Sequence, residues 1–285
     1  MSRPARIRLS TVAFALGAVV AVGIAAAIAV IYEGFYNVAA TRQHLSPTYR
    51  VLQVALDASI ERHSSGISVP PLDDAAMIDR GLGLYKAHCE QCHGGPGVAP
   101  APFALGLTPL PTNLVHAARE RPPAELYWVV KNGLKMTGMP AWQFRFSEPD
   151  LWAVVAGMRQ LTRMTTRDYA QRVTAANTPL QQAASVGRDA SSVPDAVRGK
   201  MALKQYACTT CHSIPGVVGA HAPVGPPLDR IGSRQYIAGV LPNSRENMER
   251  WLREPQKVSP RNAMPDLGVS ARDAADMAEY LYTLR

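Results

Sequence analysis

Two copies of the pentapeptide Cys-x-x-Cys-His are the residues of this chain most able to do chemistry. They use all four cysteines of the 285-residue sequence, and they are Cys89-Glu-Gln-Cys92-His93 and Cys208-Thr-Thr-Cys211-His212. This spacing is the signature of covalent haem attachment, in which both thiols form thioether bonds and the adjacent His ligates the iron. We therefore predict two covalently bound haem c groups, with His93 and His212 as iron ligands.

Other uses of a cysteine pair fit the two motifs less well. A thioredoxin-like pair needs a neighbouring βαβ pattern, and the sequence shows none. A zinc site assembled from both pairs leaves the trailing His of each motif unexplained. Zinc binding or a disulfide stays open as the alternative to haem.

A haem iron held by His needs a second axial ligand, and Met in that position raises the reduction potential. A Met-Pro dipeptide follows each motif, with Met139 in the first case and Met264 in the second. The duplicated context predicts Met139 and Met264 as the axial ligands. Met136 is the rival in the first loop, and Met248 is a weaker rival because it lies on a predicted helix over 245–253.

The amino terminus determines where these sites would lie. Residues 1–10 form a basic flank with three arginines, and 11–32 form an apolar run without charge. At about 1.5 Å per residue this run is about 33 Å long, enough to cross a bilayer core of about 30 Å. We expect a single transmembrane anchor in the bacterial inner membrane, with the arginines cytoplasmic and the remainder in the periplasm. A cleaved signal peptide is the alternative.

A juxtamembrane segment, 33–72, follows the anchor. Within it, Ser46 and Pro47 predict a helix start, and apolar residues then recur at helical spacing from Tyr49 to Ile60. This amphipathic helix is expected either to lie on a membrane or partner, or to pack on its own protein.

The rest of the sequence divides into two units of similar layout, 73–165 and 195–285, joined by a predicted flexible linker, 166–194. Each unit opens with a helix that leads into its Cys-x-x-Cys-His motif. Each closes with a helix that begins at a Ser-x-x-Asp capping box, Ser147 in the first unit and Ser270 in the second. Few alternating apolar runs occur, so the predicted fold class is all-α.

Together these features resemble the class I cytochrome c family, duplicated into a membrane-anchored di-haem protein. The resemblance rests on the two motifs, on Tyr85 and Tyr206 just before them, and on Met139 and Met264 after them. It implies two tandem class I cytochrome c domains behind the transmembrane helix.

The resemblance also implies details inside each unit. The first and last helices are expected to cross at a glycine and an aromatic residue, namely Gly81 or Gly83 with Trp152, and Gly199 with Tyr280. A carbonyl from a proline-containing stretch is expected to accept the proton of the axial His. The stretch 225–228 resembles that segment closely, and 111–114 does so more loosely.

Residues 243–267 further resemble the c-type domains that serve haem-copper oxidases. The resemblance therefore implies an electron-transfer protein without catalysis of its own, with a terminal oxidase and an upstream donor as redox partners. The alternatives are the electron-accepting subunit of a periplasmic dehydrogenase and a di-haem peroxidase. The net charge of +8 comes with no basic stripe, so we expect no nucleic-acid partner. Because each iron would have two protein ligands, we also expect no small-molecule substrate.

Overall fold

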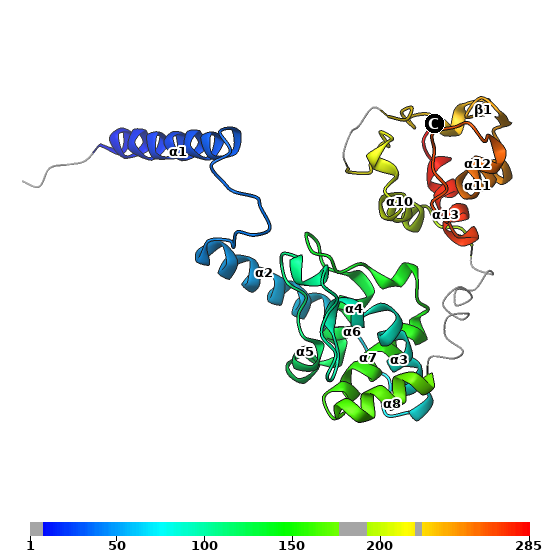
Figure 1. The fold of residues 1–285 in the computed structure, drawn as a ribbon. Coiled ribbons are helices and arrows are strands. Elements are labelled where there is room, and N and C mark those ends of the chain that lie inside the picture. The colour runs from blue at the N-terminus through cyan, green and yellow to red at the C-terminus, as the bar shows by residue number, and fades with distance from the viewer. Residues whose placement is uncertain (1–7, 177–192, 220–223) are drawn as a thin grey trace, which may run out of the picture.

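The computed structural model describes residues 8–176, 193–219 and 224–285. Helices account for most of the regular structure in these ranges (Figure 1). The predicted all-α class needs one correction, a hairpin of two-residue strands in the second unit. Its strands β1 and β2 pair antiparallel, with Tyr236 opposite Pro242 and Ile237 opposite Leu241.

The elements fall into two groups along the chain. The first group is α1 Leu9–Tyr32, α2 Ser46–Ser64, α3 Ala75–His88, α4 Glu90–His93, η1 Ala104–Gly106, α5 Leu114–Glu120, α6 Pro123–Asn132, η2 Trp142–Phe144, α7 Glu148–Leu161 and α8 Thr166–Ala176. The second group is α10 Ala196–Gln205, η3 Cys208–Thr210, η4 Ile231–Ser233, β1 Tyr236–Ile237, β2 Leu241–Pro242, α11 Arg245–Arg253, α12 Pro255–Val258 and α13 Ala271–Leu281.

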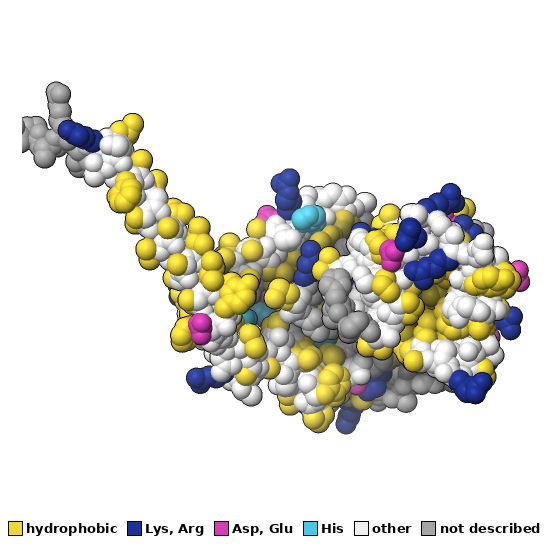
Figure 2. Space-filling view, turned by 90° about the horizontal axis from the view of Figure 1, so that it is seen from above, with side chains coloured by type: hydrophobic (Ala, Val, Ile, Leu, Met, Phe, Trp, Pro, Cys, Tyr) yellow, Lys and Arg dark blue, Asp and Glu magenta, His cyan; other side chains and the backbone are white. Residues whose placement is uncertain are grey.

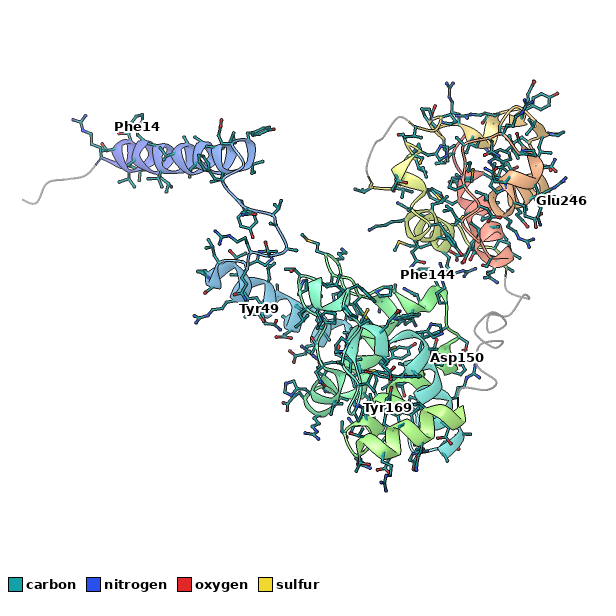
Figure 3. All side chains as sticks on the ribbon, in the orientation of Figure 1. Phe14, Tyr49, Phe144, Asp150, Tyr169 and Glu246 are labelled. Carbon is teal, nitrogen blue, oxygen red and sulfur yellow. The ribbon has the colours of Figure 1, made fainter. Side chains whose placement is uncertain are left out.

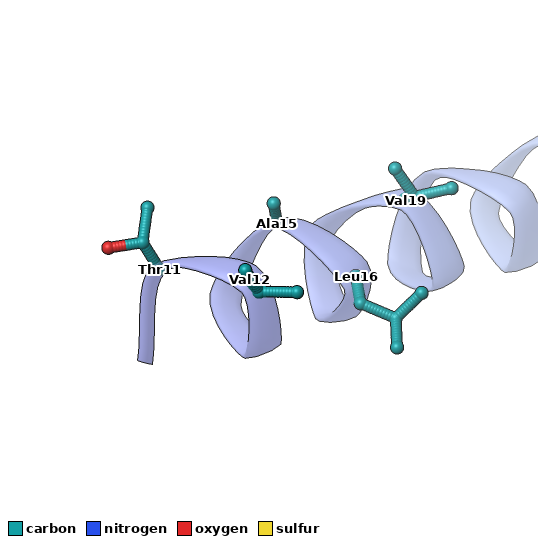
Figure 4. Close-up of a pocket in the computed structure, with 5 residues that line it drawn as sticks. All are labelled: Thr11, Val12, Ala15, Leu16 and Val19. Carbon is teal, nitrogen blue, oxygen red and sulfur yellow. The ribbon is translucent and has the colours of Figure 1, made fainter. Parts of the chain in front are cut away.

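Helix α1 stands apart from the rest of the first group. None of its 24 residues is buried, and its surface is covered by apolar side chains (Figure 2). Thr11, Val12, Ala15, Leu16 and Val19 lie along one such face (Figure 4). Within the described part of the chain, α1 is the helix long and apolar enough to cross a membrane. An apolar surface of this length suits lipid rather than water.

Helix α2 packs on its own protein over its carboxyl-terminal half. Ile60 is buried, and the His63 ring stacks on Trp128 of α6 at 5.5 Å between centroids. The other half differs, because Tyr49 and Leu52 are exposed. Only part of the predicted apolar face is therefore covered by the first unit.

The first unit is built on the crossing of α3 with α7. A Cβ built on Gly81 would lie 1.7 Å from the carbonyl oxygen of Ala153, and one built on Gly157 would lie 2.7 Å from the Gly81 backbone. The two helix backbones thus touch where neither carries a side chain. Trp152, expected at this contact, precedes Ala153 in α7 and stacks on Tyr127 at 4.0 Å between centroids.

The second unit repeats this crossing with α10 and α13. A Cβ on Gly199 would lie 1.8 Å from the carbonyl oxygen of Asp276. Tyr280, expected at the contact, donates a hydrogen bond from its hydroxyl to the carbonyl of Pro215 at 2.6 Å. Helix α13 begins at the predicted capping box, where Ser270 accepts a hydrogen bond from the Asp273 backbone N–H.

Each crossing lies within its own hydrophobic core. One cluster of buried residues runs from Ile78 to Val173, and the other from Ala202 to Leu281. The first cluster includes Tyr169 and Val173, which belong to α8. Residues 166–176, predicted to begin the linker, therefore form a helix packed on α3 of the first unit. The segment 166–176 has too few apolar residues to show a helical period in the sequence, and those residues pack against another helix.

The glycine crossing yields a stability prediction. We expect Gly81→Ala to lower the free energy of unfolding by about 1–3 kcal/mol, because the new methyl group must push α3 away from α7. Chemical denaturation of the full chain, followed by far-ultraviolet circular dichroism, measures this change. Gly66→Ala is the matched control, since a Cβ there meets nothing within 4 Å. Equal stability of the two variants would contradict the prediction.

A carboxylate that is almost fully covered, Asp276, lies at the crossing of the second unit. It accepts hydrogen bonds from Arg198 Nε at 2.9 Å and from the Asp195 backbone N–H at 2.8 Å. Burial favours the neutral acid, but Arg198, the Asp195 N–H and Arg272 outweigh it. The pKa of Asp276 therefore lies below its ordinary value.

The lowered pKa of Asp276 predicts how acid acts on the second unit. A carboxyl whose folded pKa is below its unfolded pKa stabilises the fold above the unfolded value, and this stability disappears as pH falls through the folded pKa. We expect Arg198→Ala to raise the pKa of Asp276 and to move the midpoint of acid unfolding upward by about half a pH unit or more. Acid titration followed by circular dichroism tests this. Lys204→Ala, which removes an exposed cation from the same helix, should leave the midpoint unchanged.

Candidate haem sites

The first motif lies directly behind helix α3. Cys89 ends α3, and α4 carries Cys92 and His93. His93 Nδ1 lies 2.7 Å from the carbonyl oxygen of Thr112. Because a carbonyl only accepts, Nδ1 carries the ring proton, and Nε2 keeps the lone pair that binds a metal.

The second motif has the same arrangement on different elements. Cys208 begins η3, and His212 Nδ1 lies 2.7 Å from the carbonyl oxygen of Pro226. A Cβ on Gly225 would lie 2.5 Å from the His212 ring, so the chain passes over this imidazole where it has no side chain. The expected carbonyl partner is thus present in both units, including the first, where the sequence match was loose.

The first cysteine of each motif has a raised thiol pKa, and all four cysteines are unpaired thiols. Burial raises the pKa of the Cys89 thiol to about 12 and that of Cys208 to about 11. Reactive Cys-x-x-Cys pairs instead have a lowered thiol pKa. Among the residues with described positions, no three His, Cys, Asp or Glu side chains are grouped to hold a metal ion.

The two predicted Met residues occupy loops of the same construction. The Met139 backbone N–H donates to Thr137 Oγ1 at 3.0 Å, and the Met264 N–H donates to Asn262 Oδ1 at 2.7 Å. Gln256 Nε2 also donates to the Met264 carbonyl at 2.7 Å. A polar side chain two residues earlier therefore orders the backbone at each Met. Sequence reasoning missed this signal, although the polar residue is visible in both loops.

The rival methionines lie in different surroundings. The Met136 side chain is 96 % exposed, whereas Met248 is 2 % exposed within helix α11 of the second core. Met139 packs at the edge of the cluster that contains Cys89, and Met264 packs at the edge of the second cluster, as does Cys208. Each Met-Pro loop therefore borders the same core as its motif.

Helix α8 packs beside the first motif and contacts Glu90, which lies within it. Sequence reasoning did not find this feature. Tyr169 of α8 is almost fully buried, and its hydroxyl donates to Glu90 Oε2 at 2.6 Å (Figure 3). Glu90, which lies between the two cysteines, also forms an ion pair with Lys86. Burial and the nearby Glu90 carboxylate raise the pKa of Tyr169, so its hydroxyl stays a proton donor.

Comparison with known proteins gives partial matches. Residues 76–156 match the family described as cytochrome C oxidase, cbb3-type, subunit III. The chain is also similar to cytochrome c oxidase subunit 2 of Alkalihalophilus pseudofirmus, with 34% identity over 89 residues, 31% of this chain and 25% of that protein. The corresponding protein of Bacillus subtilis is 32% identical over 89 residues, which is 30% of this chain and 25% of that protein.

The chain thus spans about a quarter of the length of these curated relatives. No solved structure matches it. The donor set of the first unit fits haem c, because two unpaired thiols precede an imidazole whose Nε2 is free and a Met-Pro loop borders the same core. Residues 76–156 are a class I cytochrome c domain like that of cbb3-type oxidase subunit III, and such a domain implies covalently bound haem c.

Proposed function

We propose that this chain is a membrane-anchored electron-transfer protein with two covalently attached haem c groups. One group belongs to residues 73–165, extended by α8, and the other to residues 195–285. The observation that carries the proposal is the repeated geometry. In each unit, a Cys-x-x-Cys-His motif has its His Nδ1 held by a carbonyl, and an ordered Met-Pro loop borders the same core.

The proposed roles follow from the donor types. Cys89, Cys92, Cys208 and Cys211 form the thioether bonds. The remaining ligands bind iron in pairs, His93 with Met139 and His212 with Met264. Bound haem of this kind exchanges one electron at a time between ferrous and ferric iron. Two protein ligands for each iron leave no open position for a substrate, which argues against peroxidase activity and for electron transfer without catalysis.

The proposed location is the periplasmic side of the bacterial inner membrane. The apolar helix α1 would cross the membrane once, and the arginines before it would stay in the cytoplasm. Covalent haem attachment outside the cytoplasm agrees with this orientation. Tethering raises the effective concentration of both units near other membrane proteins.

We further propose a terminal oxidase as electron acceptor, with a separate upstream donor. The support is that the matching family and the similar relatives are described as subunits of cytochrome oxidases. An electron-accepting subunit of a periplasmic dehydrogenase would have the same haem chemistry but a different partner.

Ligand substitution tests the haem assignment. We expect the denatured wild-type chain to carry the additional mass of two haem groups. Met139→Ala and Met264→Ala should each abolish the Met-to-iron charge-transfer absorption of one haem and lower its reduction potential, because the thioether favours ferrous iron. Spectroelectrochemical titration measures both. Met136→Ala is the control and should change neither haem. A chain without bound haem, or unchanged spectra and potentials in a ligand variant, would refute the corresponding assignment.

Partner identity is tested on native membranes. We expect the full chain, gently solubilised and captured, to co-purify with subunits of a terminal oxidase. That enzyme should also oxidise the reduced chain. The oxidation rate should differ in the Met264→Ala variant, because the lowered reduction potential of its second haem changes the driving force for electron transfer. Recovery with a dehydrogenase and without an oxidase would replace the proposed partner by the alternative one.

A further inference from the structure

One arginine of the first unit contacts the second unit close to its motif. Arg145 lies between η2 and α7, beside Phe144 at the edge of the first unit (Figure 3). Its Nη1 donates to Asp273 Oδ2 at 3.1 Å, and its guanidinium carbon lies 5.0 Å from the centroid of the Tyr206 ring. This combines an ion pair with a cation–π contact across the two units.

The carboxylate that receives Arg145 is rigidly held. The Asp273 side chain is 3 % exposed, and its Oδ2 accepts hydrogen bonds from the Tyr206 hydroxyl at 2.8 Å and from Ser270 Oγ at 2.9 Å. Asp273 is also the acidic residue of the capping box that begins α13. The acceptor therefore has one position, which gives the approaching guanidinium a defined place to bind.

The two units use equivalent arginines differently. Arg80 and Arg198 each precede the crossing glycine of their unit. Arg80 pairs with Asp150, the capping-box carboxylate of its own unit, whereas Arg198 pairs with Asp276, one turn beyond the capping box. The capping-box carboxylate of the second unit, Asp273, is thus left for a cation from elsewhere. Arg145 supplies that cation.

Both sides of this contact adjoin a haem-attachment motif. Phe146 follows Arg145, and its ring lies 5.2 Å from the ring of His88, the residue before Cys89. On the other side, Tyr206 precedes Cys208 by two positions. Arg145 therefore links a segment that packs on the residue before Cys89 with the segment that leads into Cys208.

We propose that Arg145 is a positioning residue that docks the second unit on the first and holds the two haem groups at one separation. The inference rests on the proposed function and adds the route by which the units cooperate. Each transfer would oxidise one ferrous iron and reduce the other, ferric iron, with no bond made or broken. Because the Arg145 side chain is 39 % exposed, dissolved salt weakens the contact.

Three full-length variants test the docking. Arg145→Ala removes the contact, and Arg145→Lys keeps the charge but loses the planar group over Tyr206. Arg163→Ala removes an exposed arginine of the same unit and is the charge-matched control. Haem mass and Met-to-iron absorption are recorded first for every variant, since these report on the proposed function and not on docking.

Two further measurements report on docking itself. Pulsed electron paramagnetic resonance gives the dipolar coupling between the two oxidised irons, and flash photolysis of half-reduced protein gives the rate of electron equilibration between them. We expect Arg145→Ala to lose the single defined coupling and to slow equilibration at least about tenfold, because a charged partner of a nearly buried carboxylate is removed. Arg145→Lys should restore part of the rate, and raised salt should slow the wild type more than Arg145→Ala.

The outcomes separate the two proposals. Wild-type protein without two Met-ligated haems overturns both. If both haems are intact and Arg145→Ala has the coupling and rate of Arg163→Ala, the docking role is overturned and the proposed function stands. Slowing in Arg145→Ala with both haems intact, and partial recovery in Arg145→Lys, supports the docking role.

Discussion

Close contact between two helix backbones at a glycine organises each unit of this protein. In the first unit, Gly81 of α3 lies against Ala153 and Gly157 of α7, and a side chain at Gly81 would overlap a carbonyl. Because α3 runs directly into Cys89, the crossing also determines where the motif begins. The second unit uses Gly199 in the same way.

Within this common frame, hydrogen bonds hold the proposed haem ligands in place. A carbonyl that accepts a hydrogen bond from Nδ1 leaves Nε2 of His93 and His212 free to bind a metal. A polar side chain two residues upstream orders the backbone at Met139 and Met264. These bonds carry no redox chemistry themselves. Their effect is to present the donors in one orientation, which lowers the cost of binding a large rigid group.

The two units differ most where they meet other parts of the chain. The first is extended by α8, whose buried Tyr169 binds Glu90 inside the motif. The residue after the first cysteine of the second motif is instead Thr209, which carries no charge. The second unit leaves its capping-box carboxylate, Asp273, to an arginine of the first. The two units thus share the glycine crossing and the proposed donors, while their carboxylates have different partners.

Local features of this protein could be predicted from its amino-acid sequence: both motifs, the apolar helix, the capping boxes at Ser147 and Ser270, and α11. Each is set by residues close together in the chain, so spacing reports it. The folded structure was needed to show that Tyr169 belongs to the first core, that Gly81 meets the Ala153 carbonyl, and that Arg145 binds Asp273. Those contacts join residues far apart in the chain, and their energies depend on packing and burial that no local pattern encodes.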